Sequence, residues 1–388
     1  MALRLSSPTS TSSSSRHATP PSRGLLQVAN VGCDALADAE PQALGLTYWF
    51  DAASHGEPYP ATVRFVGHRL GLNRKPGSGD SFIVSETVER VVPGSGRVAV
   101  SARIFDVASG EWSVTATLII PRSQRAATPA SSRRHKPPRV AASGTTGFGP
   151  VIRARAPGAR LGAWPALVSV GVGVALTVQS RLAAHAQLPR AATLSVSVIA
   201  SVVGLLGARI YYLAERGPRL LLKPRALLTA GMCIQGFVLA AIATASTGMF
   251  VVGVSVGRFL DVTAPALLFG MSVGRLGCFF GGCCTGRPTS SRWGLWSSDR
   301  RVGTRRIPTQ LLESVLALVL GVVALLAVLT GFVEPAGAVF VGAIAAYTLG
   351  RQMLFPLRDL PRKTAHGRTL TTVISAVVLA DILIAALA

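Results

Sequence analysis

The chain has 388 residues, of which 49% are hydrophobic and only 14% are charged. This composition is typical of a membrane protein, although the first 160 residues are more polar than the remainder. The net charge of +22 is concentrated beside hydrophobic spans, which favours an anionic lipid surface as partner. We find no nucleic-acid-binding motif, and an odd count of five cysteines, mostly at membrane positions, excludes a disulfide framework.

The N-terminal part divides into three regions. Residues 1–23 are rich in Ser, Thr and Pro with no apolar core after them, which predicts a disordered tail and not a secretory signal. Residues 24–121 alternate in polarity and predict a small β-sandwich-like domain. Its candidate strands are Leu46–Asp51, Ala61–Leu70, Ser81–Val91, Arg97–Asp106 and Trp112–Ile120. Residues 122–160, with nine Lys or Arg residues, are expected to be a basic linker.

Residues 161–388 contain about seven hydrophobic spans. Each span approaches the roughly 20 residues that a helix needs to cross a bilayer. They are Trp164–Arg181, Ala192–Leu213, Ala226–Thr247, Met249–Val273, Gln310–Phe332, Pro335–Leu354 and Thr369–Ala388. The basic linker and the loops 214–225, 274–309 and 355–368 hold most of the Lys and Arg, which alone predicts the N-terminus inside and the C-terminus outside.

The stretch from Asp261 to Gly286 is the most informative part of the sequence. An apolar run with Asp261 and Pro265 is followed by a segment that we expect to break into a glycine-rich turn around Arg275. Six of the residues from Gly270 to Gly286 are glycine, which permits close backbone approach. The guanidinium of Arg275 suits a phosphate there, but a glycine-rich seam between helices with a snorkelling arginine fits the spacing equally well.

Charges inside membrane spans are costly and mark functional sites. The candidates are Arg209, Arg258, Asp261, Glu313, Arg351 and Asp381. Arg258 and Asp261 are three residues apart, so they could pair on one helix face. Mutual neutralisation explains about half of these charges, but it explains less well the excess of arginine over acid near Arg275. That excess indicates an anionic ligand, for which a phospholipid headgroup is the natural choice.

Several motifs after Trp164 resemble one family. They are Gly274-Arg275-Leu276-Gly277-Cys278-Phe279-Phe280-Gly281-Gly282-Cys283, then Gly286-Arg287-Pro288-Thr289; Asp261, Ala264 and Pro265 as D-x-x-A-P; Ile307-Pro308-Thr309-Gln310-Leu311-Leu312-Glu313; Tyr347, Arg351 and Arg358; and Gly207-Ala208-Arg209-Ile210-Tyr211-Tyr212. In this order they resemble prolipoprotein diacylglyceryl transferase, a seven-helix bacterial membrane enzyme. Residues 1–160 lie outside the resemblance and look like an added domain.

The resemblance implies a function and a set of site residues. The family moves a diacylglyceryl group from phosphatidylglycerol to a lipobox cysteine of a prolipoprotein, so the expected location is the bacterial cytoplasmic membrane. By resemblance, Arg275 and Arg351 would be the essential phosphate-side arginines, with Gln235 at the position of the family's functional histidine. Roles in substrate binding are implied for Arg358, Gly286, Arg287, Asp261, Gln310 and Glu313. No cofactor and no metal are expected, and the oligomeric state is left open.

The departures from the family pattern concern polar residues that would help to activate the acceptor thiol. Gln235 cannot act as a base near neutral pH, and the signature asparagine and acid are Cys278 and Cys283. Cys278, Cys283 and Cys284 suit a redox pair, a metal site or an acyl-accepting thiol, but small packing residues are the interpretation that we favour. The family places its signature loop outside, against the loop charges, and we give the family more weight. A divergent transferase with another acceptor, or a non-catalytic lipid-binding protein, are the alternatives.

Overall fold

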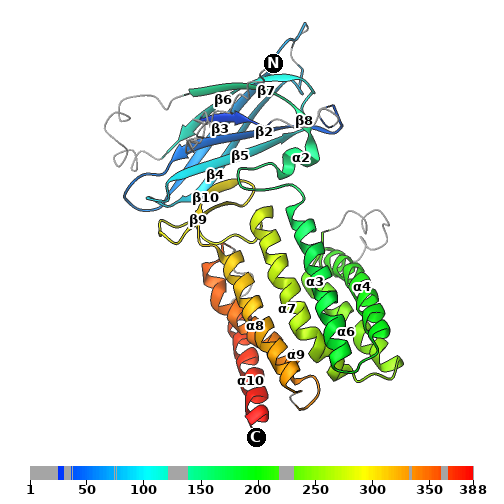
Figure 1. Cartoon of the computed structure of the whole chain (residues 1–388). Helices are drawn as coiled ribbons and strands as arrows, with labels where there is room; N and C mark the ends of the chain where they lie inside the picture. The colour runs from blue at the N-terminus through cyan, green and yellow to red at the C-terminus, as the bar shows by residue number, and fades with distance from the viewer. Residues whose placement is uncertain are drawn as a thin grey trace, which may run out of the picture.

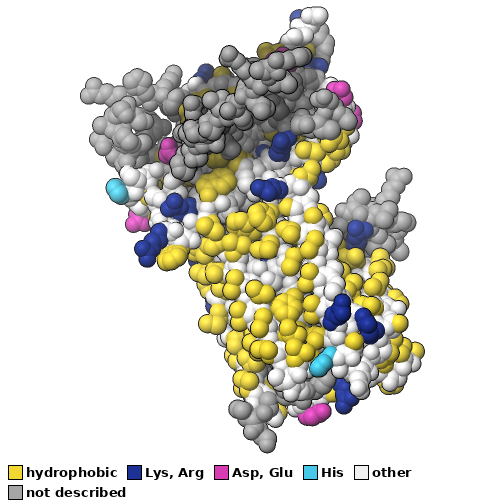
Figure 2. All heavy atoms as spheres, viewed as in Figure 1, with side chains coloured by type: hydrophobic (Ala, Val, Ile, Leu, Met, Phe, Trp, Pro, Cys, Tyr) yellow, Lys and Arg dark blue, Asp and Glu magenta, His cyan; other side chains and the backbone are white. Residues whose placement is uncertain are grey.

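The protein consists of a sheet-rich domain stacked on the end of a helical bundle (Figure 1). The computed structural model describes residues 25–29, 36, 38–73, 75, 77–120, 139–217, 231–331, 334–359 and 366–387. The tail expected at residues 1–23 lies outside them. Figure 2 shows hydrophobic side chains covering the face of the bundle, with most of the basic side chains towards its two ends. This banding is what a bilayer selects, because charged groups avoid its apolar core.

Two sheets face each other in the N-terminal domain, which confirms the prediction of a small sandwich-like β domain. The strands are β1 (Leu26–Val28), β2 (Gln42–Asp51), β3 (Tyr59–Arg69), β4 (Ser81–Val91), β5 (Arg97–Phe105), β6 (Glu111–Ile119), β7 (Arg139–Thr145) and β8 (Gly147–Phe148). One sheet has the order β1-β2-β5 with β8 beside β2, and the other has the order β4-β3-β6-β7. All five strands expected from the sequence are present.

Three strands of the N-terminal domain were not predicted. β1 and β8 are too short to show alternation, and β7 lies inside the range expected to be a linker. The β7 sequence is dominated by Ala, Ser and Gly, which have little preference for strands, so its pairing with β6 decides its conformation.

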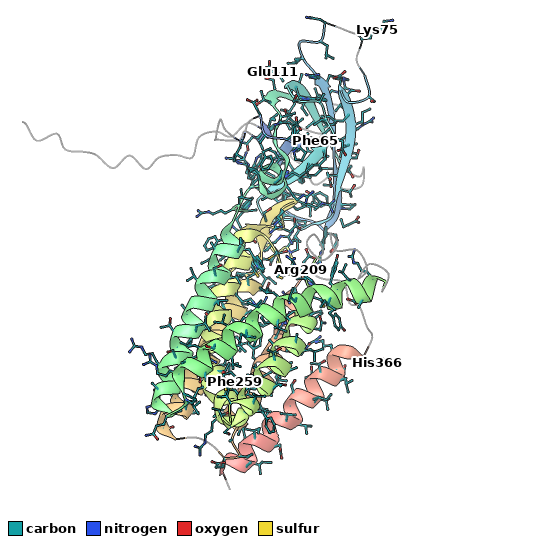
Figure 3. All side chains as sticks on the ribbon, turned by 90° about the vertical axis from the view of Figure 1, so that its right-hand side faces the viewer. Phe65, Lys75, Glu111, Arg209, Phe259 and His366 are labelled. Carbon is teal, nitrogen blue, oxygen red and sulfur yellow. The ribbon has the colours of Figure 1, made fainter. Side chains whose placement is uncertain are left out.

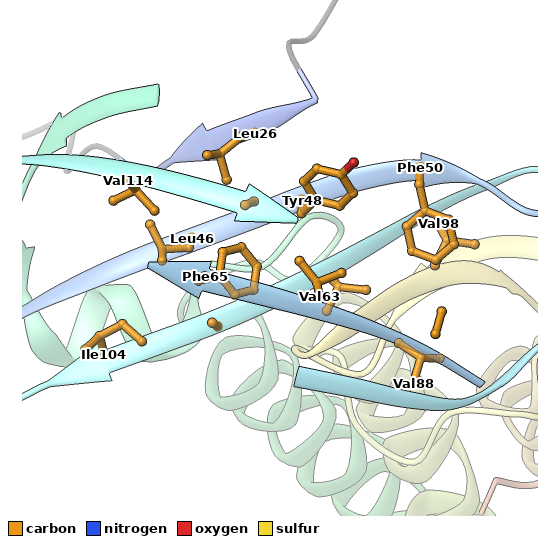
Figure 4. Packing of buried hydrophobic residues seen from close by; sticks show 14 of the residues in the cluster. Leu26, Leu46, Tyr48, Phe50, Val63, Phe65, Val88, Val98, Ile104 and Val114 are labelled. Carbon is orange, nitrogen blue, oxygen red and sulfur yellow. The ribbon is translucent and has the colours of Figure 1, made fainter. Parts of the chain in front are cut away.

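The sandwich core forms because alternate residues of each strand point inward. In β3, Ala61, Val63 and Phe65 are buried while the residues between them are more exposed. Phe65 and Val63 face Leu46 across the two sheets (Figure 4). Burying a side chain of this size stabilises the fold by about 1.5–3 kcal/mol.

The prediction of seven membrane-crossing helices is confirmed for the described part of the chain. After the short α2 (Gly149–Ala154) these helices are α3 (Ala163–His185), α4 (Arg190–Arg216), α6 (Ile234–Val251), α7 (Val256–Gly281), α8 (Thr309–Thr330), α9 (Ala338–Leu354) and α10 (Gly367–Leu387). The third helix begins at Ile234 and not at the expected Ala226; residues 218–230 lie outside the described residues.

The expected glycine-rich turn around Arg275 is wrong, because α7 continues through Arg275 to Gly281. The glycines instead allow α7 to pack closely against α3. A Cβ atom at Gly270 would lie 2.7 Å from the carbonyl oxygen of Gly171 on α3, and one at Gly277 would lie 3.3 Å from that of Trp164. The spacing of these glycines puts them on one face of α7, so α3 and α7 approach backbone to backbone. The packing-seam interpretation is therefore correct for the glycines.

A hairpin from the membrane domain joins the two halves. It is formed by β9 (Leu295–Ser298) and β10 (Val302–Arg306), between α7 and α8 (Figure 1). β10 pairs antiparallel with β5, so the first sheet continues as β5-β10-β9. Trp296 stacks on Trp49 of β2 with ring centroids 5.7 Å apart, and its Nε1 donates to the carbonyl oxygen of Arg97 at 3.1 Å.

Removing the Trp296 indole is expected to loosen the β domain from the bundle. The stacked pair contributes about 0.5–1.5 kcal/mol beyond its burial, and the hydrogen bond contributes about as much again. Trp296→Ala should therefore increase the rate of limited proteolysis within the hairpin by several-fold in detergent. Trp293→Ala is the matched control, because the Trp293 side chain is 76% exposed. Equal cleavage rates in the two variants would contradict the expectation.

Candidate active site

Arg275 lies in the last two turns of α7, close to the β domain. It precedes the helix end at Gly281 by six residues, or about 9 Å along the axis. The C-terminal end of α9 and the N-terminal end of α8 lie at this same end of the bundle (Figure 1). Charged side chains from α7, α8 and the segment after α9 meet there, just inside the boundary of the membrane spans.

Glu313 on α8 lies between two arginines. Its Oε2 is 3.0 Å from Arg275 Nε, and its Oε1 is 3.5 Å from Arg358 Nη1. Both contacts are ion pairs by distance, but neither carboxylate oxygen accepts a hydrogen bond of normal geometry. Glu313 is 1% exposed and Arg358 is 3% exposed. Because the pairs are buried, each charge depends on its partners for compensation.

Two further groups from α9 complete this cluster. The Tyr347 hydroxyl accepts a hydrogen bond from Arg275 Nη2 at 3.4 Å. Arg351 follows Tyr347 by four residues, so it lies on the same face one turn later. Arg351 is half-buried, and among the described residues no hydrogen bond or ion pair reaches its side chain. The buried Nε of Arg358 likewise has no hydrogen-bond partner there.

The loop after α7 is held against the start of α8. Gly286 packs so closely that a Cβ atom there would lie 2.1 Å from the carbonyl oxygen of Ile307, so only glycine fits. Arg306, which is 2% exposed, donates to the Gly286 carbonyl at 3.1 Å and pairs with Asp359 at 2.7 Å and Asp299 at 2.9 Å. We did not predict this role for Arg306, whose only signal was a basic pair just before the α8 span.

Gln310 and Arg287 also position this loop. Gln310 Nε2 donates to the carbonyl oxygen of Cys283 at 3.0 Å. The Arg287 amide donates to the carbonyl of Leu357 at 2.9 Å, and its Nε donates to the carbonyl of Arg358 at 3.3 Å. These contacts attach the loop to both α8 and the segment after α9.

Asp261 lies far from the arginine cluster. It precedes Arg275 by 14 residues on α7, or about 21 Å, near the opposite end of the bundle. Its carboxylate accepts hydrogen bonds from the amides of Gly337 at 2.7 Å and Phe340 at 3.0 Å, so it caps the first turn of α9. Among the described residues no ion pair joins it to Arg258, and the pairing expected from their spacing is not formed.

Gln235 lies in the first turn of α6, near the end of α4 that carries Arg209 (Figure 3 labels Arg209). Its side chain is exposed and accepts a hydrogen bond from Cys233 Sγ at 2.6 Å. Within the described ranges, no hydrogen bond connects Gln235 to Arg275, Arg351 or Arg358. Gln235, at the position where the resemblance implies a histidine, therefore lies at the same end of the bundle as Arg275 but is not joined to the arginine cluster.

Three cysteines gather beside the arginines. Cys278, Cys283 and Cys284 have their sulfur atoms within 4.8 Å of one another. Hydrogen bonds from the Cys278 and Cys283 thiols, together with the positive charges of Arg358 and Arg275, lower the pKa of the Cys284 thiol. Hydrogen bonds with Cys278 and Cys284, together with burial, raise the pKa of Cys283.

Comparison with known proteins identifies the family. The sequence model of prolipoprotein diacylglyceryl transferase matches residues 155–387, which is more than half of the chain. The chain belongs to the prolipoprotein diacylglyceryl transferase family. The matched region includes α3 to α10 with the β9–β10 hairpin, here called the membrane domain, and the protein is a multi-pass membrane protein.

Several relatives are named phosphatidylglycerol–prolipoprotein diacylglyceryl transferase. The one from Chloroflexus aggregans is 36% identical over 97 residues, which cover 24% of this chain and 32% of the relative. The one from Clostridium tetani is 23% identical over 210 residues, 53% of this chain and 84% of the relative. The one from Mycobacterium tuberculosis is 29% identical over 231 residues, 53% of this chain and 49% of the relative. The matched part of the chain thus spans between about a third and four fifths of the length of these relatives.

Removing the Glu313 carboxylate from this transferase-family site should destabilise the protein. Arg358 would then stay buried without a partner, a situation that costs about 3–5 kcal/mol. We expect Glu313→Ala to lower the thermal unfolding midpoint in detergent clearly, as measured by intrinsic fluorescence. Glu111→Ala, which removes an exposed carboxylate of β6, should leave the midpoint within error. An unchanged midpoint in Glu313→Ala would show that the two ion pairs do not compensate the buried charge.

Proposed function

We propose that the protein transfers the diacylglyceryl group of phosphatidylglycerol to a lipobox cysteine of a prolipoprotein, in the bacterial cytoplasmic membrane. The observation that supports this most is the excess of positive charge at the cluster. Arg275 and Arg358 contact a single buried carboxylate, Glu313, and Arg351 lies one turn beyond Tyr347, which contacts Arg275. An unneutralised buried charge is unfavourable, so this arrangement favours an anionic ligand.

The proposed reaction places its charge where the arginines lie. The acceptor sulfur attacks the glycerol carbon that carries the phosphate ester, and a carbon–sulfur bond forms as the carbon–oxygen bond breaks. The electron pair of the broken bond leaves with glycerol phosphate, and the thiol proton is released. Negative charge therefore grows on the phosphate in the transition state. Guanidinium groups that are fixed beforehand stabilise such charge without reorganisation.

Each residue of the cluster has a distinct task in this proposal. Arg275 and Arg351 bind the phosphate, and the Arg351 side chain is the one with no partner among the described residues. Arg358 supports them, and its buried Nε provides a donor for a phosphate oxygen. Glu313 positions Arg275 and Arg358 relative to each other, because it contacts both. Gly286 and Arg306 hold the loop against α8.

We assign Asp261 a role in the fold, whereas the family motif implies a role in substrate binding. Its carboxylate is occupied by two amides at the start of α9, about 21 Å along α7 from Arg275. We propose that it acts on the fold by fixing α9, which carries Tyr347 and Arg351, against α7. Gln310 and Arg287 act in the same indirect way, through the loop.

Alanine substitution of either phosphate-side arginine should abolish transfer. The assay combines purified protein in detergent with phosphatidylglycerol and a lipobox peptide, and it measures peptide mass and released glycerol phosphate. We expect Arg275→Ala and Arg351→Ala each to reduce the rate by at least about 100-fold, the loss typical of one charge-stabilising group. Arg258→Ala is the matched control, since Arg258 is an exposed arginine at the other end of α7. Retained activity in both variants would refute the proposed function.

One observation favours a second candidate, a family member that binds the lipid but uses another acceptor or none. Gln235 supplies no base, and its side chain is not connected to the cluster. On this alternative, phosphatidylglycerol binds to the wild-type protein and binding is lost in Arg275→Ala, while no mass is gained by the lipobox peptide. A diacylglyceryl-sized mass gain on the peptide excludes it.

A further inference from the structure

We propose that Cys278, Cys283 and Cys284 form a three-thiolate site for one zinc(II) ion, whose fourth position binds the sulfur of the acceptor cysteine. This inference rests on the proposed function for the identity of the acceptor. It departs from the sequence-based expectation that the protein holds no metal and that these cysteines are packing residues. The three sulfur atoms converge at one point, which favours a shared ligand over simple packing.

The distances suit a single ion. Zinc–sulfur bonds of about 2.3 Å in tetrahedral geometry separate sulfur atoms by about 3.8 Å. The three sulfurs already lie within 4.8 Å of one another, so closure around an ion needs a shift of about 1 Å or less. Thiolates are the ligands that soft or borderline metals such as zinc prefer.

The backbone fixes the three cysteines in place. Cys278 is in the last turn of α7, and Gly282 ends the helix in a left-handed conformation. The Cys283 amide then donates to the carbonyl of Cys278 at 3.1 Å, which returns Cys283 to the helix end. Gln310 holds the Cys283 carbonyl. A site assembled on such fixed backbone loses little entropy on binding an ion.

The site is open on one side. Among the described residues the group contains three possible ligands and no fourth His, Cys, Asp or Glu. Structural zinc sites have four protein ligands, whereas sites that do chemistry keep one position for water or substrate. Cys278 is buried, but Cys283 and Cys284 are only partly buried, so the fourth position can be reached from outside the protein.

The location connects the metal site to the phosphate site. Arg275 precedes Cys278 by three residues, so both lie on one face of α7. The positive charges of Arg275 and Arg358 offset the negative charge that several thiolates bring to a zinc ion. An acceptor sulfur on the ion would lie beside the arginines that hold the lipid phosphate. Such placement of two reactants accelerates a reaction through proximity.

The metal would supply what Gln235 cannot. A thiol that coordinates zinc loses its proton, so no histidine base is required. The acceptor proton passes to solvent, as do the protons of the three ligand thiols when the ion binds. The sulfur then forms its bond to the glycerol carbon, glycerol phosphate leaves with the electron pair, and the neutral thioether dissociates from the ion. No oxidant or reductant is needed.

Metal binding is tested first, without lipid or peptide. The full chain is purified in detergent, reduced, stripped of metal and titrated with cobalt(II), whose sulfur charge-transfer absorption reports thiolate ligands, and then with zinc(II) to displace it. We expect one ion per chain. Cys283→Ser and Cys284→Ser should each weaken binding by more than about 100-fold, since losing a group that only orients a metal ligand already costs about 10–100-fold. Cys233→Ser is the control, because Cys233 is outside the cluster. Absence of binding, or equal affinity in Cys283→Ser, overturns the site.

Acceptor binding is tested next on the cobalt-loaded protein. A lipobox peptide with cysteine should increase the charge-transfer absorption, and the same peptide with serine should not. No difference between the peptides overturns the role of the fourth position. Full transfer activity in the metal-free chain overturns the zinc proposal but leaves the proposed function intact. Metal and cysteine-peptide binding without transfer overturns the proposed function and leaves the zinc site intact.

Discussion

The end of the membrane domain that carries the candidate site depends on one buried carboxylate. Glu313 touches Arg275 of α7 and Arg358 after α9, so a single side chain of α8 connects three segments that are distant in sequence. Without it, the buried Arg358 and the partly buried Arg275 would both lack a carboxylate partner, and an uncompensated desolvated charge costs several kcal/mol. The same constraint explains the ligand preference of the site. One carboxylate cannot neutralise three arginines, and the residual charge favours an anion.

A second constraint holds the loop that carries the cysteines. Arg306 satisfies the carbonyl of Gly286 and pairs with Asp299 and Asp359. The strand that ends in Arg306, β10, also pairs with β5 of the N-terminal β domain. The N-terminal β domain is thus attached through the segment that shapes the proposed site. Its sheet is extended by the hairpin, so the position of Arg306 depends on the β domain as well as on the bundle.

The glycines of α7 show how one sequence pattern can serve two purposes. The glycine-rich pattern is compatible with an anion-binding turn and with a packing seam. The helix continues through this region, and Gly270 and Gly277 face α3. Arg275 lies on the same helix but points to Glu313 and Tyr347. Close approach of the backbones is what brings α7 deep enough in the bundle for Arg275 to be partly buried, so the seam and the arginine site depend on each other.

The sequence by itself determined the seven spans and the five main strands, because these follow from hydrophobic periodicity. The resemblance of its motifs predicts one site that contains Arg275, Arg351 and Arg358, and the cost of a charge at membrane depth drew attention to Glu313. Only the tertiary structure decided which charges meet. Arg258 and Asp261 have the spacing of a helix pair, yet Asp261 bonds to the amides of α9, since unsatisfied amides at a helix start compete for the carboxylate. β7 and the pairing of β10 with β5 escaped prediction for a similar reason. Strand conformation there depends on a partner far away in the chain, and no local pattern encodes it.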